Sequence, residues 1–138
     1  MSEPLTFVDT NVIVYAHNAS EPVKHERARA LLESLWRDRA AVTSTQVLAE
    51  LYSAVTRKLS RPPAAGRDLV LIYASWPIVQ VDVPLIVAAT ERHERDQLSF
   101  WDALVVEAAL RSGASRLATE DLQSGRRFDG LEIVNPLA

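Results

Sequence analysis

The sequence predicts an α/β fold with a mainly parallel sheet covered by helices on both faces. Short apolar segments, typical of buried strands, alternate along the chain with longer segments whose apolar residues recur at helical spacing. The chain has 138 residues and contains no internal repeat, low-complexity tract or long linker. That length suits one hydrophobic core, so residues 1–138 are expected to form a single domain.

Apolar runs bounded by turn and cap residues locate the individual elements of this fold. The predicted strands cover residues 5–8, 41–43, 78–81, 116–119 and 131–134. The predicted helices cover residues 12–17, 21–39, 44–60, 64–75, 84–95 and 100–111. Asp129-Gly130 predicts a turn just before the last strand.

Cap residues and prolines set the ends of the predicted helices. Ser20 is expected to cap the second helix. Thr43 and Gln46 fit a capping box at the start of the third helix. Ser99 is expected to cap the last helix. Between the third helix and the last one, prolines at positions 62, 63, 77 and 84 mark the ends of the predicted elements.

The composition indicates a globular protein outside the membrane. Apolar residues make up 48% of the chain and charged residues 24%, as is usual for soluble domains. The apolar runs are far shorter than the roughly 20 residues of a membrane-spanning helix. Glu3 and Pro4 stand where a signal peptide carries positive charge. We therefore expect a cytoplasmic location.

The available ligand residues restrict which metals the chain can bind. There is no cysteine, which excludes disulfides and thiolate metal sites, and the three histidines lie far apart without ligand spacing. A metal here would need oxygen ligands. That requirement favours Mg²⁺ or Mn²⁺ over zinc.

The net charge of −3 argues against a broad basic surface that binds nucleic acid regardless of sequence. It leaves room for a small basic rim around an acidic site. Arg57, Lys58 and Arg61 form one local basic group, and Arg126 with Arg127 forms another. Taken singly, such residues are more often solvated surface charges.

Four acidic residues lie where the predicted fold brings chain segments to one edge of the sheet. Asp9 directly follows the first strand, and Asp121 follows the fourth. Glu50 lies early in the helix after the second strand, and Asp102 lies in the first turn of the helix before the fourth. In parallel sheets the ligand crevice lies at the carboxyl ends of the strands, so these four side chains are expected to converge.

Each acid alone has an ordinary structural explanation. An Asp after a strand is commonly a turn or cap residue, and Asp102 suits a helix N-terminus. Glu50 is harder to explain, because its sequence neighbours are apolar and a carboxylate in apolar surroundings is costly unless it is paired or coordinated. Together the four acids favour a functional site.

A cluster of carboxylates is chemically reasonable as a site for a divalent cation. Carboxylates held close together repel one another and resist ionisation, and a cation removes that cost. Mg²⁺ bound by a few carboxylates keeps positions open for water and phosphate oxygens. Such a site can lower the pKa of water and stabilise charge on a leaving oxygen. The predicted chemistry is hydrolysis of a phosphodiester.

Several short motifs follow one another along the chain: "DTN" at Asp9, "LAELYSAV" around Glu50, "SFWDALVVEAAL" around Asp102, "LATEDLQSG" around Asp121 and the closing "LEIVNP". These motifs and their order resemble those of the PIN-domain nucleases, and most closely the VapC toxins of bacterial toxin–antitoxin modules. The resemblance covers essentially the whole chain. Each short motif is weak alone, but the ordered set is specific.

The resemblance implies an α/β/α sandwich with a five-stranded parallel sheet. It also implies a Mg²⁺- or Mn²⁺-dependent endoribonuclease with Asp9, Glu50, Asp102 and Asp121 as metal-site carboxylates. Asn11 and Thr119 match polar positions that orient the acids or a water, although Asn11 is equally suited to cap the next helix. Glu120, beside Asp121, is an alternative for the fourth acid.

The same resemblance has implications for substrate, product and partners. It implies cleavage of structured RNA that leaves a 5′-phosphate and a 3′-hydroxyl. It also implies a homodimer and inhibition by a cognate antitoxin. Nothing in the sequence selects one particular RNA.

Two other functions compete with this interpretation. The first is a phosphohydrolase with Asp9 as covalent nucleophile, but such enzymes normally carry a second Asp two residues on, where this chain has Asn11. The second is a non-catalytic PIN-like binding module, which the presence of all four acids disfavours.

The three tryptophans are expected in the core. Trp101 precedes Asp102, where its ring could stack on a base, but aromatic residues at helix starts are more often core. Trp36 and Trp76 are interpreted in the same way.

Overall fold

The computed structural model describes residues 4–138, so Glu3 lies outside the described residues. The strands are β1 (Thr6–Val8), β2 (Ala41–Ser44), β3 (Ile78–Val79), β4 (Arg116–Ala118), β5 (Arg127–Phe128) and β6 (Leu131–Val134). The helices are α1 (Thr10–Ala16), α2 (Pro22–Arg37), α3 (Thr45–Arg57), α4 (Pro63–Tyr73), α5 (Val83–Asp96) and α6 (Phe100–Arg111). The predicted elements are confirmed, with shifts of a few residues at their ends. None of the helices within this part of the chain is long and apolar enough to cross a bilayer.

The strands form one sheet in the order β3-β2-β1-β4-β6-β5. All neighbouring pairs are parallel except β5 and β6. β1 lies in the centre, and its neighbours β2 and β4 leave their carboxyl ends on the same edge as its own. This edge is where the four acids are expected from the sequence.

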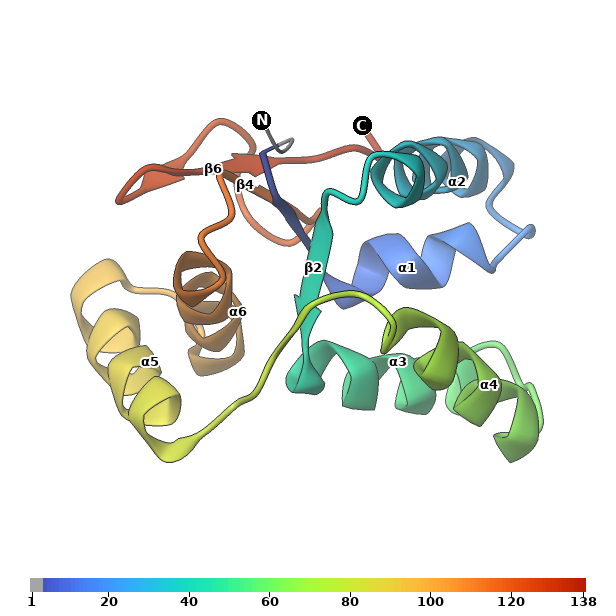
Figure 1. Ribbon diagram of the computed structural model, residues 1–138, viewed down its shortest axis with the longest axis horizontal. Helices are drawn as coiled ribbons and strands as arrows, with labels where there is room; N and C mark the ends of the chain where they lie inside the picture. Colours follow the sequence, from blue (N-terminus) through green and yellow to red (C-terminus); the bar gives the residue numbers. More distant parts are fainter. Residues whose placement is uncertain (1–3) are drawn as a thin grey trace.

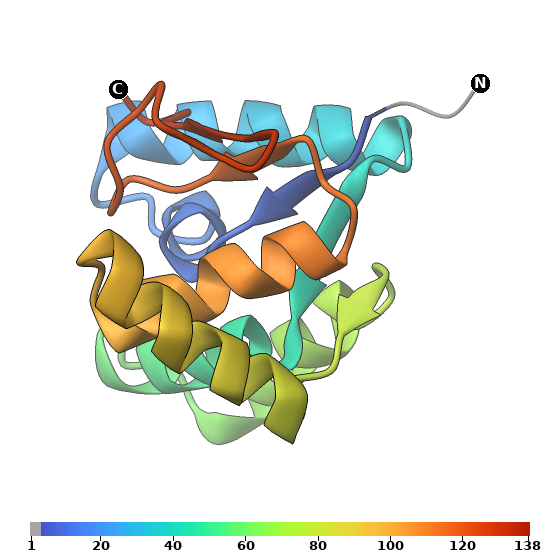
Figure 2. The ribbon, with the colours of Figure 1, turned by 90° about the vertical axis from the view of Figure 1, so that its left-hand side faces the viewer.

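Helices cover both faces of the sheet and form a three-layer α/β/α arrangement. Figure 1 shows α5 and α6 on one side of β1 and β2, and α1 with α2 on the other. In Figure 2 α6 lies between the sheet and α5, which packs on the outer side of α6. α3 starts at the end of β2 and packs against α1 and α4. The predicted layering is confirmed.

The central strands are apolar on both faces because each face packs against helices. Phe7 and Val8 of β1, Leu117 of β4 and Ile133 of β6 are fully buried. The helices add Ile13, Leu51 and Val106, among others, to this core. The core fixes the strands, and so it fixes the position of the residues at their carboxyl ends.

The prediction of five parallel strands is wrong by one strand. Arg127 and Phe128 form β5, which pairs antiparallel with β6 through a tight turn. Asp129 and Gly130 occupy this turn with positive φ angles of 49° and 91°, which confirms the predicted turn at these positions. A two-residue strand has no detectable apolar pattern, so the sequence does not indicate it.

Two predicted helix caps are also wrong. α2 is preceded by Glu21 as its N-cap residue without a side-chain cap bond, and the Ser20 hydroxyl donates to Asn18 instead. α3 is capped by Ser44, whose Oγ accepts from the backbone nitrogen of Val47 at 3.3 Å. The Thr43 hydroxyl donates to the backbone oxygen of Val8, so the predicted capping box with Gln46 does not form. Ser99 caps α6 as predicted.

A buried arginine joins α5, α6 and the β5–β6 turn. The Arg92 side chain donates to Glu107 at 2.6 Å, to Asp96 at 2.8 Å and to Asp129 at 3.1 Å. Only 5% of Arg92 is exposed, so the three carboxylates compensate a charge that has little access to water. This network holds the outer helix α5 onto the rest of the fold.

The prediction that all three tryptophans are core residues holds only for Trp76. Trp76 is buried, whereas Trp36 is 42% exposed and Trp101 is 64% exposed. Trp36 lies at the end of α2, where it packs edge-on against Trp76 and Tyr73. Trp101 lies in the first turn of α6, and the buried side of that helix is made of other residues.

Candidate active site

The four predicted acids lie around the carboxyl ends of β1, β2 and β4. Asp9 directly follows β1, and Asp121 lies shortly after β4. Glu50 is on α3, which begins where β2 ends, and Asp102 is in the first turn of α6. The fold therefore brings all four to the same edge of the sheet.

Asp9 is buried at the start of α1, with 6% of its surface exposed. Its Oδ1 accepts a hydrogen bond of 2.8 Å from the backbone nitrogen of Thr10, and its Oδ2 accepts one of 2.9 Å from the Thr119 hydroxyl. Burial raises the pKa of Asp9 to about 6 in spite of these bonds, and the charges of Asp121 and Glu50 add to the increase. The carboxylate is held firmly in surroundings that disfavour its negative charge.

Thr119 connects the residues at the ends of β1 and β4. Its hydroxyl donates to Asp9, and its Oγ1 accepts from the Asn11 amide at 3.3 Å and from the backbone nitrogen of Asp121 at 3.1 Å. The Asn11 Oδ1 also accepts from the backbone nitrogen of Glu120 at 3.4 Å. Asn11 does not cap α1, because Asp9 is the N-cap residue. Asn11 and Thr119 together fix the chain after β4 against the start of α1.

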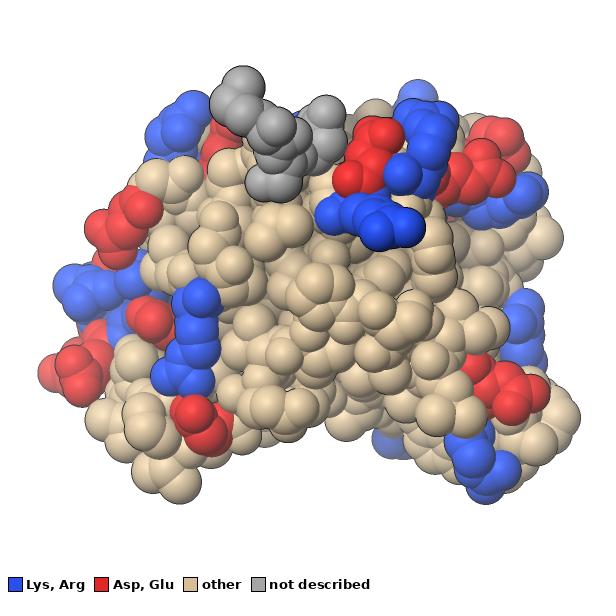
Figure 3. Space-filling view, in the orientation of Figure 1, with Lys and Arg blue, Asp and Glu red and all other residues tan. Residues whose placement is uncertain are grey.

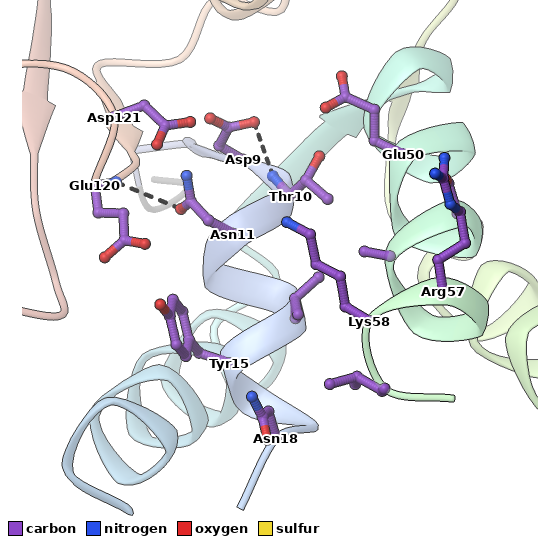
Figure 4. Close-up of a pocket in the computed structure, with 14 residues that line it drawn as sticks. Asp9, Thr10, Asn11, Tyr15, Asn18, Glu50, Arg57, Lys58, Glu120 and Asp121 are labelled. Carbon is purple, nitrogen blue, oxygen red and sulfur yellow. Dashed lines mark hydrogen bonds between the residues drawn. The ribbon is translucent and has the colours of Figure 1, made fainter. Parts of the chain in front are cut away.

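A cavity of about 830 Å³ opens beside Asp9. Asp9, Glu50 and Asp121 line it, so three of the four predicted acids share one cavity. Figure 4 shows their carboxylates in one row across one side of the cavity. The effect of Asp121 and Glu50 on the pKa of Asp9 indicates the same proximity.

Asp102 lies beside this row but outside the lining of the cavity. Burial raises the pKa of Asp102, and the charge of Asp121 raises it further. Its backbone nitrogen donates to the Ser99 hydroxyl at 3.1 Å, which fixes the first turn of α6. Asp121 is therefore the acid that acts electrostatically on both Asp9 and Asp102.

Glu120 points away from the row of acids. Its Oε2 accepts a hydrogen bond of 3.0 Å from the amino group of Lys24 on α2, which also lies over the Tyr15 ring. In Figure 4 the Glu120 carboxylate points away from Asp9, whereas the Asp121 carboxylate lies near it. Of the two alternatives for the fourth acid, Asp121 is the one whose side chain is at the acidic centre.

Glu50 is exposed, which corrects the expectation that apolar neighbours surround it. Leu48 and Leu51 point into the core from other sides of α3, so residues adjacent in sequence are not adjacent in space. The Glu50 Oε1 accepts from the Gln46 amide at 2.7 Å, one helical turn earlier. The helical repeat of α3 therefore places Glu50 on the cavity side, and the apolar residues next to it in the sequence do not indicate this position.

Sequence reasoning missed Lys24. This residue lies on the first turns of α2, which do not follow a strand, and nothing in its local sequence distinguishes it from a surface lysine. Its pairing with Glu120 joins residues far apart in the chain. Only the packing of α2 beside α1 brings it to the site.

The acidic donors at the cavity are all carboxylate oxygens. Within residues 4–138, no group of three or more His, Cys, Asp or Glu side chains is arranged to hold a metal as it stands. The cavity nevertheless offers carboxylate oxygens from Asp9, Glu50 and Asp121, the ligand type that hard cations prefer. None of these three carboxylates forms an ion pair with a side chain in the described part of the protein. A buried acid beside two further acids lacks a compensating positive charge, which a cation would supply.

Comparison with known proteins gives consistent results. The PIN domain family matches residues 6–129. Ribonuclease VapC23 of Mycobacterium tuberculosis is 31% identical over 120 residues, which cover 85% of this chain and 93% of that protein.

Two solved structures share the fold. A toxin-antitoxin complex from Klebsiella pneumoniae has a TM-score of 0.71 at 14% identity, covering 95% of this chain and 97% of that chain. VapC20 of M. tuberculosis, described as a sarcin-ricin loop cleaving toxin, has a TM-score of 0.63 at 24% identity, covering 81% of this chain and 86% of that chain.

The family match spans most of the chain and includes Asp9, Glu50, Asp102 and Asp121. The similarity to VapC23 extends over nearly the whole of that protein. The chain therefore belongs to the PIN-domain family and, within it, to the VapC ribonucleases.

Proposed function

We propose that this protein is a metal-dependent endoribonuclease that acts as the toxin of a toxin–antitoxin pair. The observation that carries the proposal is the position of Asp9, a buried carboxylate that shares a cavity with Glu50 and Asp121 and has no cationic partner among the described residues. The relationship of the protein to the VapC ribonucleases supports RNA as the substrate.

The four carboxylates Asp9, Glu50, Asp102 and Asp121 would hold the cation, Mg²⁺ or Mn²⁺. When bound, the cation supplies activation of water and neutralisation of charge on the phosphate, which phosphodiester hydrolysis requires. The oxygen-only donor set supports this assignment. The raised pKa values of Asp9 and Asp102 also support it, because they show that the surroundings disfavour the charged carboxylates, and a nearby cation would stabilise that charged form.

The supporting residues would keep the acids in position. The Thr119 hydroxyl orients the Asp9 carboxylate, and Asn11 fixes Thr119 and the backbone at Glu120. Hydrogen bonds of this kind hold ligand oxygens in the geometry that a cation requires. Glu120 is paired with Lys24, so its role would be to help hold the chain around the site in place. Asp121 would serve as the ligand.

We further propose that a cognate antitoxin protein inhibits the enzyme, that the toxin is a homodimer, and that it acts in the cytoplasm. Support for the antitoxin comes from the fold that this chain shares with a chain of the toxin-antitoxin complex from Klebsiella pneumoniae. The cytoplasm is the compartment that contains the RNA substrate.

The direct test is incubation of the purified protein with total RNA, with Mn²⁺ and with EDTA, followed by mapping of new 5′ ends. We expect discrete cleavage sites carrying 5′-phosphates in Mn²⁺ and no cleavage in EDTA. An Asp102→Asn variant, folded by circular dichroism, is the control for contaminating nucleases. Equal cleavage by this variant and the wild type would contradict the assignment of the site.

The toxin role needs a separate test in living bacteria. Induced expression of the wild-type protein alone is expected to arrest growth, and expression of the Asp102→Asn variant at the same level is expected not to. Normal growth with soluble wild-type protein would exclude the toxin role in that host and leave the nuclease activity to be judged by the RNA assay.

A further inference from the structure

The cavity beside Asp9 has walls of opposite charge. The acids lie on one side, and Arg57 and Lys58, from the end of α3, line the other. In Figure 4 the Lys58 side chain extends from α3 toward the start of α1, where Thr10 and Asn11 lie. A cavity with both kinds of charge suits a ligand that binds a cation and also carries negative charge of its own.

The arrangement follows from the helical repeat of α3. Glu50, Ser53, Ala54 and Arg57 all line the cavity, and their spacing of i, i+3, i+4 and i+7 places them on one face of the helix. Glu50 is therefore at the acidic end of this face, and Arg57 lies two turns farther, a rise of about 10 Å. The face leads from the acidic centre to a positively charged end.

Arg57 and Lys58 are available for a ligand. Both are exposed, and neither forms an ion pair with any acid in residues 4–138. The other basic residues near the site are engaged. Arg61 donates to the backbone oxygen of His17 at 2.6 Å, and Lys24 is bound to Glu120.

The second predicted basic group is engaged elsewhere. Arg126 lies over the Phe128 ring, and Arg127 pairs with Glu132 at 3.7 Å. Neither residue lines the cavity. Of the two basic groups in the sequence, the cavity receives only Arg57 and Lys58.

We propose that Arg57 and Lys58 form a phosphate-binding subsite that holds the RNA strand next to the bond that is cleaved. This inference rests on the proposed function and deepens it. An RNA backbone carries one negative charge per nucleotide, and a row of carboxylates repels it. The protein has a net charge of −3 and so gives no general attraction. Figure 3 shows one face of the molecule with charged side chains near its margins and no continuous basic tract.

The subsite defines the path of the strand through the cavity. Arg57 and Lys58 lie about two helical turns along α3 from Glu50, so a strand bound there would follow α3 and bring a phosphate further along the same strand to the acidic centre. Contacts to phosphate position a nucleic acid without reading its sequence. We therefore expect the two residues to affect affinity for every RNA alike and to leave the choice of cleavage site unchanged.

The test compares two double variants with equal loss of charge. R57Q/K58Q removes the subsite. R67Q/R116Q removes two exposed arginines, on α4 and on β4, that do not line the cavity. The affinity of each protein for a fluorescent single-stranded RNA is measured in EDTA, where no metal-dependent cleavage occurs, over a series of salt concentrations. Melting temperatures confirm that both variants are folded.

We expect the slope of log affinity against log salt to become shallower by about 1.4 in R57Q/K58Q, which corresponds to two lost phosphate contacts on a single strand. The slope of R67Q/R116Q is expected to remain at the wild-type value. In the Mn²⁺-dependent cleavage assay, R57Q/K58Q should raise KM and leave kcat nearly unchanged.

Equal slopes in the two double variants would overturn the subsite. A lower melting temperature of R57Q/K58Q with an unchanged slope would do the same, because it would show that the residues only stabilise the end of α3. Failure of the proposed function has a different signature. In that case the wild type would cleave no RNA in Mn²⁺, whereas the slopes in EDTA would still report on phosphate binding.

Discussion

The Thr119 hydroxyl donates a hydrogen bond of 2.9 Å to Oδ2 of Asp9, although the two residues are 110 positions apart in the chain. The parallel pairing of β1 with β4 brings them together. Val8 and Ala118 are partners in that pair, Asp9 directly follows Val8, and Thr119 directly follows Ala118. The sheet register thus determines the orientation of the buried carboxylate.

Replacement of Thr119 by Val keeps the shape of the side chain and removes the donor. Asp9 then loses one of the two hydrogen bonds that oppose the rise of its pKa, and its carboxylate is less fixed. We expect Mn²⁺-dependent RNA cleavage to fall by about 10- to 100-fold, as is common when a residue that supports a metal ligand is lost. Thr119→Ser, which keeps the hydroxyl, should retain most of the activity. Loss of activity in both variants would point to packing instead of the hydrogen bond.

Asp121 and Glu120 are adjacent in sequence but differ in their environment. The charge of Asp121 raises the pKa of Asp9 and of Asp102, whereas Glu120 forms an ion pair with Lys24. We therefore expect Asp121→Asn to reduce cleavage by at least about 100-fold and Glu120→Gln to reduce it by less than about tenfold. Initial rates at saturating Mn²⁺ measure both effects. The reverse ranking would make Glu120 the fourth acid.

The position of the site is predictable from sequence because it depends on strand ends. Asp9 directly follows a fully buried strand, and the carboxyl ends of parallel strands meet at one edge of the sheet. Asp102 is predictable because Ser99 gives a clear helix start. These signals are local, and the rules that connect them hold for all sheets of this class.

The parts that sequence does not reveal depend on packing between distant elements. Lys24 reaches Glu120 only because α2 packs beside α1, and no local pattern encodes that approach. Residue type alone predicts Trp101 in the core, yet it is exposed because the buried side of α6 is made of other residues. The sequence neighbours of Glu50 are misleading, because the helical repeat places them on other faces of α3.

The Arg92 network allows a test of how α5 is held. Arg92→Gln leaves the carboxylates of Glu107 and Asp96 without their cation in a poorly hydrated place. We expect the free energy of unfolding to fall by about 3 kcal/mol, as for removal of one partner of a buried ion pair. Arg111→Gln, which breaks the exposed pair with Asp82, should lower the free energy of unfolding much less, because water already screens that pair. Urea unfolding curves give both values, and equal losses would mean that burial of Arg92 does not matter.

The buried Asp9 makes the stability of the metal-free protein depend on pH. The pKa of Asp9 is about 6 in the folded protein, against an ordinary value of 3.8, so between these values the folded state binds more protons than the unfolded chain. Stability therefore falls as the pH rises through this range, and the full penalty for burying the charge is reached above about pH 6. The difference between the two pKa values corresponds to about 3 kcal/mol.

Asp9→Asn has no charge to bury, so its stability should lack this pH-dependent loss. In EDTA, we expect the melting temperature of Asp9→Asn relative to the wild type to increase between about pH 4 and about pH 7, and to change little above that. Mn²⁺ should stabilise the wild type at the upper end of this range, where the carboxylate is charged, and should have little effect on Asp9→Asn. A constant difference between the two melting temperatures across the range would show that burial does not penalise the charge of Asp9, and the electrostatic reason for placing a cation beside it would be lost.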